Sequence, residues 1–243
     1  MKSVLITGGN QGIGFETARI LVKQGYFVYL GCRSAEAGEE AARRLRNEGS
    51  STVTWVQIDV TDQKSIEQAV SSVTHDRESL DVLINNAGIM GARPVAGENY
   101  PVEEIQRVFE TNVFGVVRVT QAFLGLLGKS RSPRIVNVSS GLGSLTMHSD
   151  PNWRFSKYKH PAYMPSKTAL NAYTVLLAAQ LGNRGFKVNS VDPGHTSTAF
   201  NNYGGERPAS ESAVFVARAA TIEDDGPNGR FLSDHLSGGE LPW

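Results

Sequence analysis

Tyr163 and Lys167 stand four positions apart in the stretch "YMPSK". On a helix, this spacing places both side chains on one face, one turn apart. A tyrosine titrates with a pKa of about 10, and a neighbouring cation lowers that pKa. We therefore expect Lys167 to acidify Tyr163, and the pair predicts general acid catalysis on a substrate oxygen.

A second tyrosine, Tyr158, competes for this role. Pro161 and Pro165 decide between the two, because proline fits the first turn of a helix, where N–H groups have no intrahelical partner. The helix is predicted to begin close to Ala162, which leaves Tyr158 in the preceding loop. Tyr163 is therefore the reactive candidate.

A glycine-rich turn, "TGGNQGIG" at residues 7–14, joins the first predicted strand to the first predicted helix. Such a turn lets the backbone approach a pyrophosphate, whose charge the helix N-terminus stabilises. The glycine spacing is a variant of the dinucleotide fingerprint, and the alternative is a turn that only needs positive φ angles. The strand–turn–helix context favours the cofactor. The predicted phosphate site comprises Gly8, Asn10, Gln11, Gly12, Ile13 and Gly14.

The second predicted strand ends in Cys32 and Arg33, with no acidic residue at its tip. An acid there would bind the ribose hydroxyls of NAD, whereas an arginine suits the 2′-phosphate of NADP. A solvated surface arginine is the alternative. We predict NADPH or NADP⁺ as the cofactor, with NADH less favoured, and Asn10 as a further donor to the same phosphate.

The chain alternates short β-branched runs with helical patterns, which predicts βαβ units and a mainly parallel sheet. Helices are expected on both faces of this sheet, within a single domain, because no linker or repeat divides the chain. Residues 201–208 are predicted to form a mobile loop. Strands are predicted at 2–7, 27–31, 53–58, 82–85, 134–138, 187–191 and 230–232. Helices are predicted at 12–24, 35–47, 63–73, 102–127, 163–181 and 211–219.

The 24 basic and 24 acidic residues balance, which argues against a nucleic-acid partner. The single cysteine, Cys32, excludes an internal disulfide and fits a reducing compartment. We expect no membrane partner, since no apolar run approaches the ~18 residues of a membrane span. The early first strand leaves no room for a secretory leader, so the predicted location is cytoplasmic. The histidines lack ligand-like spacing, and no metal site is predicted.

Seven short motifs follow one another along the chain. They are "TGGNQGIG", "DV" at 59–60, "NNAG" at 85–88, "TNVFG" at 111–115, "IVNVSSGLG" at 135–143, "YMPSK" and "VDPGHTST" at 191–198. Together they resemble the short-chain dehydrogenase/reductase family, over residues 2 to about 200, and its carbonyl-reductase-like members in particular. The resemblance implies a Rossmann-type, doubly wound α/β fold with seven parallel strands in the order 3-2-1-4-5-6-7.

The resemblance also implies catalytic roles for Asn112, Ser140, Tyr163 and Lys167. Hydride would pass from NADPH to a carbonyl carbon while Tyr163 protonates the oxygen and Ser140 orients it. Lys167 would bind the nicotinamide ribose, and Asn112 would anchor a water that links Lys167 to solvent. Ser140 is preferred to its neighbour because a glycine follows at the family spacing. The remaining implied cofactor contacts are Asp59, Val60, Asn86, Ala87, Gly88, Tyr163, Lys167, Pro193, Gly194, Thr196 and Thr198.

The segment between Ser140 and Tyr163 is longer than is usual in the family and predicts an insert near residues 144–161. Its apolar side chains either line the substrate pocket or form a surface excursion; they are Met147, Trp153 and Phe155. A substrate loop is predicted near residues 195–210. Its ring side chains either line the substrate pocket or lie on the loop surface; they are His195, Phe200 and Tyr203.

The helix after Tyr163 is apolar on nearly all sides, so its outer face needs a cover, either the insert or a second subunit. The sequence leaves monomer, homodimer and homotetramer open. The leading functional prediction is NADPH-dependent reduction of a small-molecule ketone, aldehyde or quinone. Alcohol oxidation by the same residues is one alternative. A non-catalytic NADP(H)-binding sensor is another, although such a protein would usually lack Ser140, Tyr163 or Lys167.

Overall fold

Seven parallel strands form one sheet in the computed structural model, which describes residues 1–92, 99–234 and 239–243. The strand order is β3-β2-β1-β4-β5-β6-β9, so the predicted Rossmann-type fold is confirmed. Every residue of β1, β4 and β5 is buried, as expected for strands covered on both faces. The strands are β1 (Ser3–Thr7), β2 (Phe27–Cys32), β3 (Val53–Gln57), β4 (Val82–Asn85), β5 (Arg134–Val138), β6 (Lys187–Asp192) and β9 (Phe231–Ser233).

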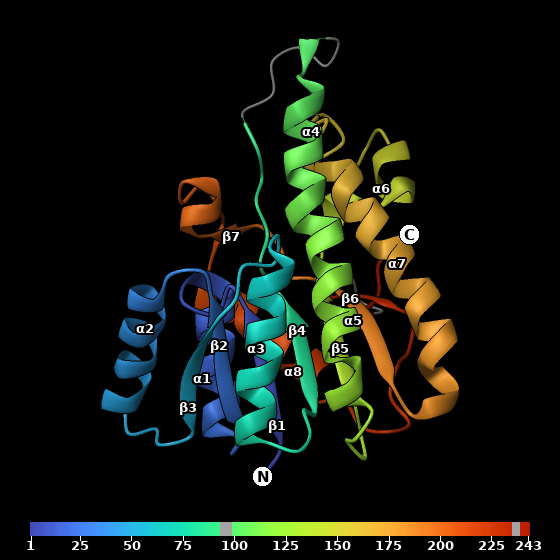
Figure 1. Ribbon diagram of the computed structural model, residues 1–243. Coiled ribbons are helices and arrows are strands. Elements are labelled where there is room, and N and C mark those ends of the chain that lie inside the picture. Colours follow the sequence, from blue (N-terminus) through green and yellow to red (C-terminus); the bar gives the residue numbers. More distant parts are fainter. Residues whose placement is uncertain (93–98, 235–238) are drawn as a thin grey trace.

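Helices cover both faces of the sheet (Figure 1). One apolar core joins the strands to α1 (Gly12–Lys23), α2 (Ala35–Asn47) and α8 (Ala209–Ala220). The other joins them to α3 (Gln63–Asp76), α5 (Val116–Leu127) and α7 (Tyr163–Leu181). This two-sided burial places the carboxyl ends of the strands, and the loops that leave them, at one edge of the molecule.

The single helix predicted at 102–127 is three segments. It comprises α4 (Val102–Phe109), a π-helical turn at Glu110–Gly115, and α5. π-Helical turns are rare and frequently occur at functional sites. Asn112 lies in this turn, so the poor helix former noted in the sequence coincides with a widened backbone.

The loops contain short elements that the sequence did not predict. The predicted insert holds α6 (Leu145–Ser149), and β7 (Thr196–Ser197) pairs in parallel with β8 (Arg207–Pro208). The segment predicted as a mobile loop therefore ends in a strand. Gly205 permits this pairing, because a Cβ at that position would lie 2.0 Å from the carbonyl carbon of Thr196.

The outer face of α7 keeps two large apolar side chains at the surface of the single chain. Val175 is 42% exposed and Leu176 is 56% exposed. Within the described ranges, none of the helices combines the length and apolar character that crossing a bilayer requires.

Candidate active site

A cavity of about 1520 Å³ opens at the carboxyl ends of the strands. Its wall includes residues that follow β1, β2, β4, β5 and β6. Ligands of open α/β sheets bind at this edge, where the strand order reverses. The volume exceeds the ~300–1,000 Å³ typical of a site for one drug-sized ligand. It therefore has room for a dinucleotide and a second molecule.

The glycine turn forms the floor of one end. Gly8 and Gly12 have φ angles of +65° and +56°, in the left-handed region that favours glycine. The N-cap residue of α1, Gln11, makes no side-chain capping bond, and the first turn holds no acidic residue. Free N–H groups of this turn thus remain at the cavity wall, as a bound pyrophosphate requires.

Asn86 fixes the turn from the neighbouring strand. Its Nδ2 donates to the carbonyls of Thr7 at 2.9 Å and Gly8 at 3.1 Å. Gly14 does not line the cavity. It is needed behind the turn, because a Cβ there would lie 2.6 Å from both Asn86 Nδ2 and the Gly8 carbonyl oxygen.

The end of the cavity beside β2 and β3 carries positive charge. Arg33 is exposed, lines the wall and forms no ion pair with any acid in the part of the chain that the structure describes. Asp59 and Val60 lie beside it, and the Asp59 carboxylate accepts from the Thr61 amide at 2.9 Å. Sequence reasoning missed Arg44 of α2, which lines the same end. It packs over the Phe15 ring of α1, with its guanidinium carbon 4.3 Å from the ring centre, and no motif signals this contact between two helices.

Ser140, Tyr163 and Lys167 all line this cavity. Ser140 follows β5, and its hydroxyl accepts from the Leu142 amide at 3.2 Å. Its side chain lies close enough to Tyr163, at the start of α7, to lower the pKa of that phenol. The neighbouring hydroxyl of Ser139 is buried and donates to Asn171 Oδ1 at 2.7 Å. The geometry therefore favours Ser140 as the serine that faces a ligand.

The expectation that Lys167 acidifies Tyr163 is wrong for the protein alone. Burial raises the pKa of Tyr163, the neighbouring Ser140 side chain lowers it, and the Asp192 carboxylate and Tyr158 add to the rise. Lys167 Nζ donates to the Val138 carbonyl at 2.8 Å and lies 5.6 Å from the centre of the Tyr163 ring. Burial lowers the pKa of Lys167 to about 8. Tyr163 is consequently a protonated phenol at neutral pH.

Asn112 is fully buried and lies behind the cavity wall. Its Oδ1 accepts from the Ile89 amide at 2.8 Å, and its Nδ2 donates to the Ile89 carbonyl at 2.9 Å and to Ser166 Oγ at 3.0 Å. A Cβ at Gly88 would lie 3.3 Å from Asn112 Oδ1 and 3.8 Å from Lys167 Nζ. Asn112 thus joins the loop after β4 to α7, close to Lys167.

The loop after β6 closes over the glycine turn. Pro193, Gly194, Thr196 and Thr198 line the cavity, and a Cβ at Gly12 would lie 3.4 Å from Thr198 Cγ2. Of the predicted cofactor residues, only Gly14 is absent from the wall. The lining residues are Gly8, Asn10, Gln11, Gly12, Ile13, Arg33, Asp59, Val60, Asn86, Ala87, Gly88, Tyr163, Lys167, Pro193, Gly194, Thr196 and Thr198.

Asp192, at the end of β6, is a further wall residue that sequence reasoning missed. Its carboxylate accepts from the Gly194 amide at 3.1 Å and from Ser233 Oγ at 3.2 Å. An acid at the carboxyl end of a buried strand is the signal that could have found it. It holds the loop after β6 and raises the pKa of Tyr163.

The other half of the cavity is lined by the predicted insert and the substrate loop. Both sets of side chains reach the wall: Met147, Trp153, Phe155, His195, Phe200 and Tyr203. His160 also reaches it, and its Nδ1 accepts from the Tyr163 amide at 3.2 Å. From the sequence, His160 was assessed only as a possible metal ligand. No cluster of three or more potential ligands (histidine, cysteine, aspartate or glutamate) occurs among the described residues.

Known proteins share this sequence pattern and fold. A family model described as short chain dehydrogenase matches residues 2–208. The short-chain dehydrogenase anuI of Penicillium roqueforti is 38% identical over 249 residues, 99% of this chain and 97% of that protein. Salutaridine reductase of Papaver bracteatum is 32% identical over 295 residues, covering 95% and 94%. NADPH-bound carbonyl reductase from chicken fatty liver has a TM-score of 0.85 at 26% identity, covering 100% of this chain and 99% of that one.

Proposed function

We propose that this chain, which belongs to the short-chain dehydrogenase family, is an NADPH-dependent reductase that converts a ketone, aldehyde or quinone to its alcohol. The family membership makes it an oxidoreductase acting on CH–OH and C=O groups. The observation that carries the finer proposal is the meeting of Ser140, Tyr163 and Lys167 on one cavity wall that also includes the glycine turn.

The residues of the glycine turn fit a dinucleotide, because backbone N–H groups line a cavity large enough to hold one. Bound NADPH supplies the hydride that the carbonyl carbon receives. Arg33 would bind the 2′-phosphate, and Asp59 and Val60 would contact the adenine. Asn86, Ala87 and Gly88 would support the ribose. Pro193, Gly194, Thr196 and Thr198 would hold the nicotinamide side.

Proton transfer is the task of the chain itself. Tyr163 gives its phenolic proton to the substrate oxygen while the carbon–oxygen double bond becomes a single bond. Ser140 donates a hydrogen bond to the same oxygen and so holds the carbonyl in place. Lys167 binds the nicotinamide ribose and stabilises the tyrosinate that remains, which is reprotonated from solvent. Asn112 fixes the backbone beside Lys167 and anchors the water of that proton path.

Burial raises the pKa of Tyr163, so in the cofactor-free protein this phenol holds the proton that a carbonyl oxygen would receive. Oxidation of an alcohol by the same residues would use the tyrosinate. Arg33, which lines the cavity and forms no ion pair among the described residues, supports NADPH over NADH, as does the NADPH bound to the chicken carbonyl reductase. The single thiol, buried in Cys32, suits a reducing compartment such as the cytoplasm.

The proposal is tested by following absorbance at 340 nm with NADPH and a panel of ketones, aldehydes and quinones. We expect loss of NADPH with at least one substrate class, and slower turnover with NADH. Tight NADPH binding without turnover of any panel member would favour the sensor. Turnover only of alcohols with NADP⁺ would favour the oxidative dehydrogenase.

A further inference from the structure

Aromatic rings from two distant segments enclose the part of the cavity around Tyr163. The insert contributes Trp153 and Phe155, whose ring centres lie 5.5 Å apart, edge to face. The substrate loop contributes His195, 5.7 Å from the Phe155 ring, and Phe200, 5.6 Å from the Tyr163 ring. These separations are typical of favourable aromatic pairs. These rings of the insert and the substrate loop form an aromatic wall, of which Phe200 contacts the ring of the proton donor.

The insert and the substrate loop each bring one acidic or basic side chain to the cavity, and the two form an ion pair. Arg154 of the insert forms an ion pair with Glu206 of the substrate loop, and both side chains line the cavity. The Arg154 guanidinium also lies 4.5 Å from the Phe155 ring centre, and His195 Nδ1 lies 3.7 Å from Glu206 Oε1. Arg154 is therefore already paired, whereas Arg33 at the cofactor end has no acidic partner within the described ranges.

From these two observations we propose that the substrate is an uncharged ring ketone, which stacks against Trp153, Phe155 and Phe200 with its carbonyl oxygen at Tyr163. This inference rests on the proposed reductase function. A flat apolar ring gains from burial and from the edge and face contacts that the wall offers. A carboxylate on the same ring would lose its water without gaining a free cation.

The test compares kcat/KM for butanone, 1-tetralone and 6-carboxy-1-tetralone with NADPH. We expect 1-tetralone to exceed butanone by about a hundredfold, and the carboxylate to reduce kcat/KM by about tenfold or more. Phe155→Ala should lower kcat/KM for 1-tetralone by about tenfold, while kcat/KM for butanone stays within about threefold of wild type. Trp153→Phe keeps an aromatic ring, so its kcat/KM for 1-tetralone should fall less than that of Trp153→Ala. Leu176→Ala, on the exposed face of α7, is the matched control. Equal efficiency for butanone and 1-tetralone, or preference for the carboxylate, would overturn the inference.

A binding measurement separates this inference from the reductase proposal. Calorimetric titration of 1-tetralone and of its carboxylate into the NADP⁺ complex measures their affinity for the aromatic wall without turnover. Tight binding of 1-tetralone alone, with no reduction, would retain the ring-ketone site and contradict the reductase. Reduction of butanone and the carboxylate as fast as of 1-tetralone would retain the reductase and contradict the ring-ketone site.

A second inference stands on a different contact, at the start of α7. His160 is 2% exposed, and its Nδ1 accepts from the Tyr163 amide at 3.2 Å. Nδ1 accepts a hydrogen bond only when it carries no proton, so this contact needs neutral imidazole. We infer that neutral His160 is a positioning residue, which fixes the backbone of Tyr163 and thereby aims its hydroxyl.

The surroundings of His160 define how this contact responds to pH. The rings of Tyr100, Tyr158 and Tyr163 pack around it, at 5.9, 6.5 and 6.2 Å between centres. Burial lowers the pKa of His160, and the Ala92 carbonyl, the His160 backbone and the Glu104 carboxylate oppose this. Protonation in acid would remove the acceptor and leave the Tyr163 amide without its partner.

The test is the pH profile of kcat in His160→Leu, His160→Asn and the control His148→Leu, which alters a histidine outside the cavity wall. We expect wild-type kcat to fall in acid, below the usual histidine pKa near 6.5. His160→Leu should lower kcat by about tenfold at pH 7, with KM for NADPH within about twofold, and should lose the acidic limb. In His160→Asn, the side-chain oxygen can accept the hydrogen bond from the Tyr163 amide. This variant should recover part of kcat without the fall in acid. Unchanged kcat with an intact acidic limb in His160→Leu would contradict the role.

Discussion

The polar side chains at the two ends of the parallel sheet differ in their partners: at one end they bond to other protein groups, and at the other they line the cavity. At the amino end, Arg134 of β5 donates to the Ile222 carbonyl at 2.9 Å and to Asp224 at 2.6 Å. At the carboxyl end, the same strand leads to Ser140, which faces the cavity. One strand therefore begins in a closed network and ends in an open site.

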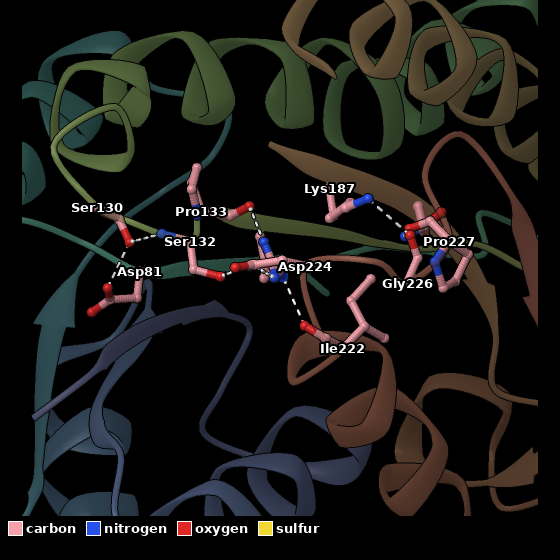
Figure 2. Close-up of polar contacts among 11 residues, drawn as sticks. Asp81, Ser130, Ser132, Pro133, Lys187, Ile222, Asp224, Gly226 and Pro227 are labelled. Atoms are coloured by element: carbon pink, nitrogen blue, oxygen red, sulfur yellow. Dashed lines mark hydrogen bonds and ion pairs between the residues drawn. The ribbon is translucent and has the colours of Figure 1, made fainter. Parts of the chain in front are cut away.

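The closed network continues around the amino end (Figure 2). Ser132 also bonds to Asp224, Ser130 bonds to Asp81, and Lys187 donates to the Gly226 carbonyl at 2.9 Å. These groups have protein partners, so they contribute to stability. At the carboxyl end, several polar side chains and backbone N–H groups that line the cavity can donate hydrogen bonds to a ligand. The comparison indicates that changes at the amino end should lower stability and leave the rate unchanged, whereas changes at the carboxyl end should lower the rate.

The largest expected effect is on rate, at the carboxyl end. Tyr163→Phe removes the proton donor, and we expect kcat to fall by about 10³-fold while NADPH affinity stays within about threefold. Steady-state kinetics and NADPH fluorescence titration measure the two quantities. Tyr158→Phe, whose hydroxyl contacts Met90 Sδ at 3.7 Å, is the control and should keep most of the activity. A Tyr163→Phe rate within about tenfold of wild type would contradict the role of this phenol.

The next effect is a pH dependence of stability that Lys167 imposes. Its pKa is lowered from 10.5 to about 8 by burial, so between these values the unfolded chain binds more protons than the folded one. The free energy of unfolding of the cofactor-free protein should therefore rise as pH increases from about 8 to 10.5, by on the order of 3 kcal/mol.

Lys167→Met should remove this rise. Urea unfolding at several pH values measures it in both proteins. The same slope in wild type and Lys167→Met would show that another group causes it.

At the amino end, Arg134→Met should cost about 2 kcal/mol of unfolding free energy, because the buried guanidinium loses its hydrogen bonds and leaves the Ile222 carbonyl without its donor. Its kcat/KM should match wild type. Arg131→Met, at an exposed neighbouring position, is the control for loss of positive charge. A large fall in kcat/KM without loss of stability would break the distinction between the two ends.

The smallest effect concerns cofactor choice. Arg33→Ala should weaken NADPH binding by about tenfold and NADH binding by much less, since only NADPH carries the 2′-phosphate. Titration with both dinucleotides gives the ratio. Arg46→Ala is the matched control, because Arg46 lies on α2 but pairs with Glu39 and does not line the cavity. An unchanged ratio in Arg33→Ala would contradict the NADPH preference.

Much of the fold was predictable because it depends on local patterns. The start of α7 at Tyr163 follows from Pro165 in its first turn, and the predicted range 163–181 matches the helix. The widened turn at Asn112 was not predictable, since its side chain bonds to Ile89 on another segment. His160 was overlooked for a similar reason, because its hydrogen bond with the Tyr163 amide forms only once the chain turns into α7.

The sequence by itself determined the order of strands and helices, the glycine turn, and which tyrosine begins a helix four residues before a lysine. These depend on periodicity, on glycine φ angles and on proline, all of which act within a few residues. Only the tertiary structure decided that burial raises the pKa of Tyr163. It also decided that the Ser139 hydroxyl donates to Asn171 and that Arg154 forms an ion pair with Glu206. Those outcomes depend on burial and on contacts between distant segments, which no local pattern encodes.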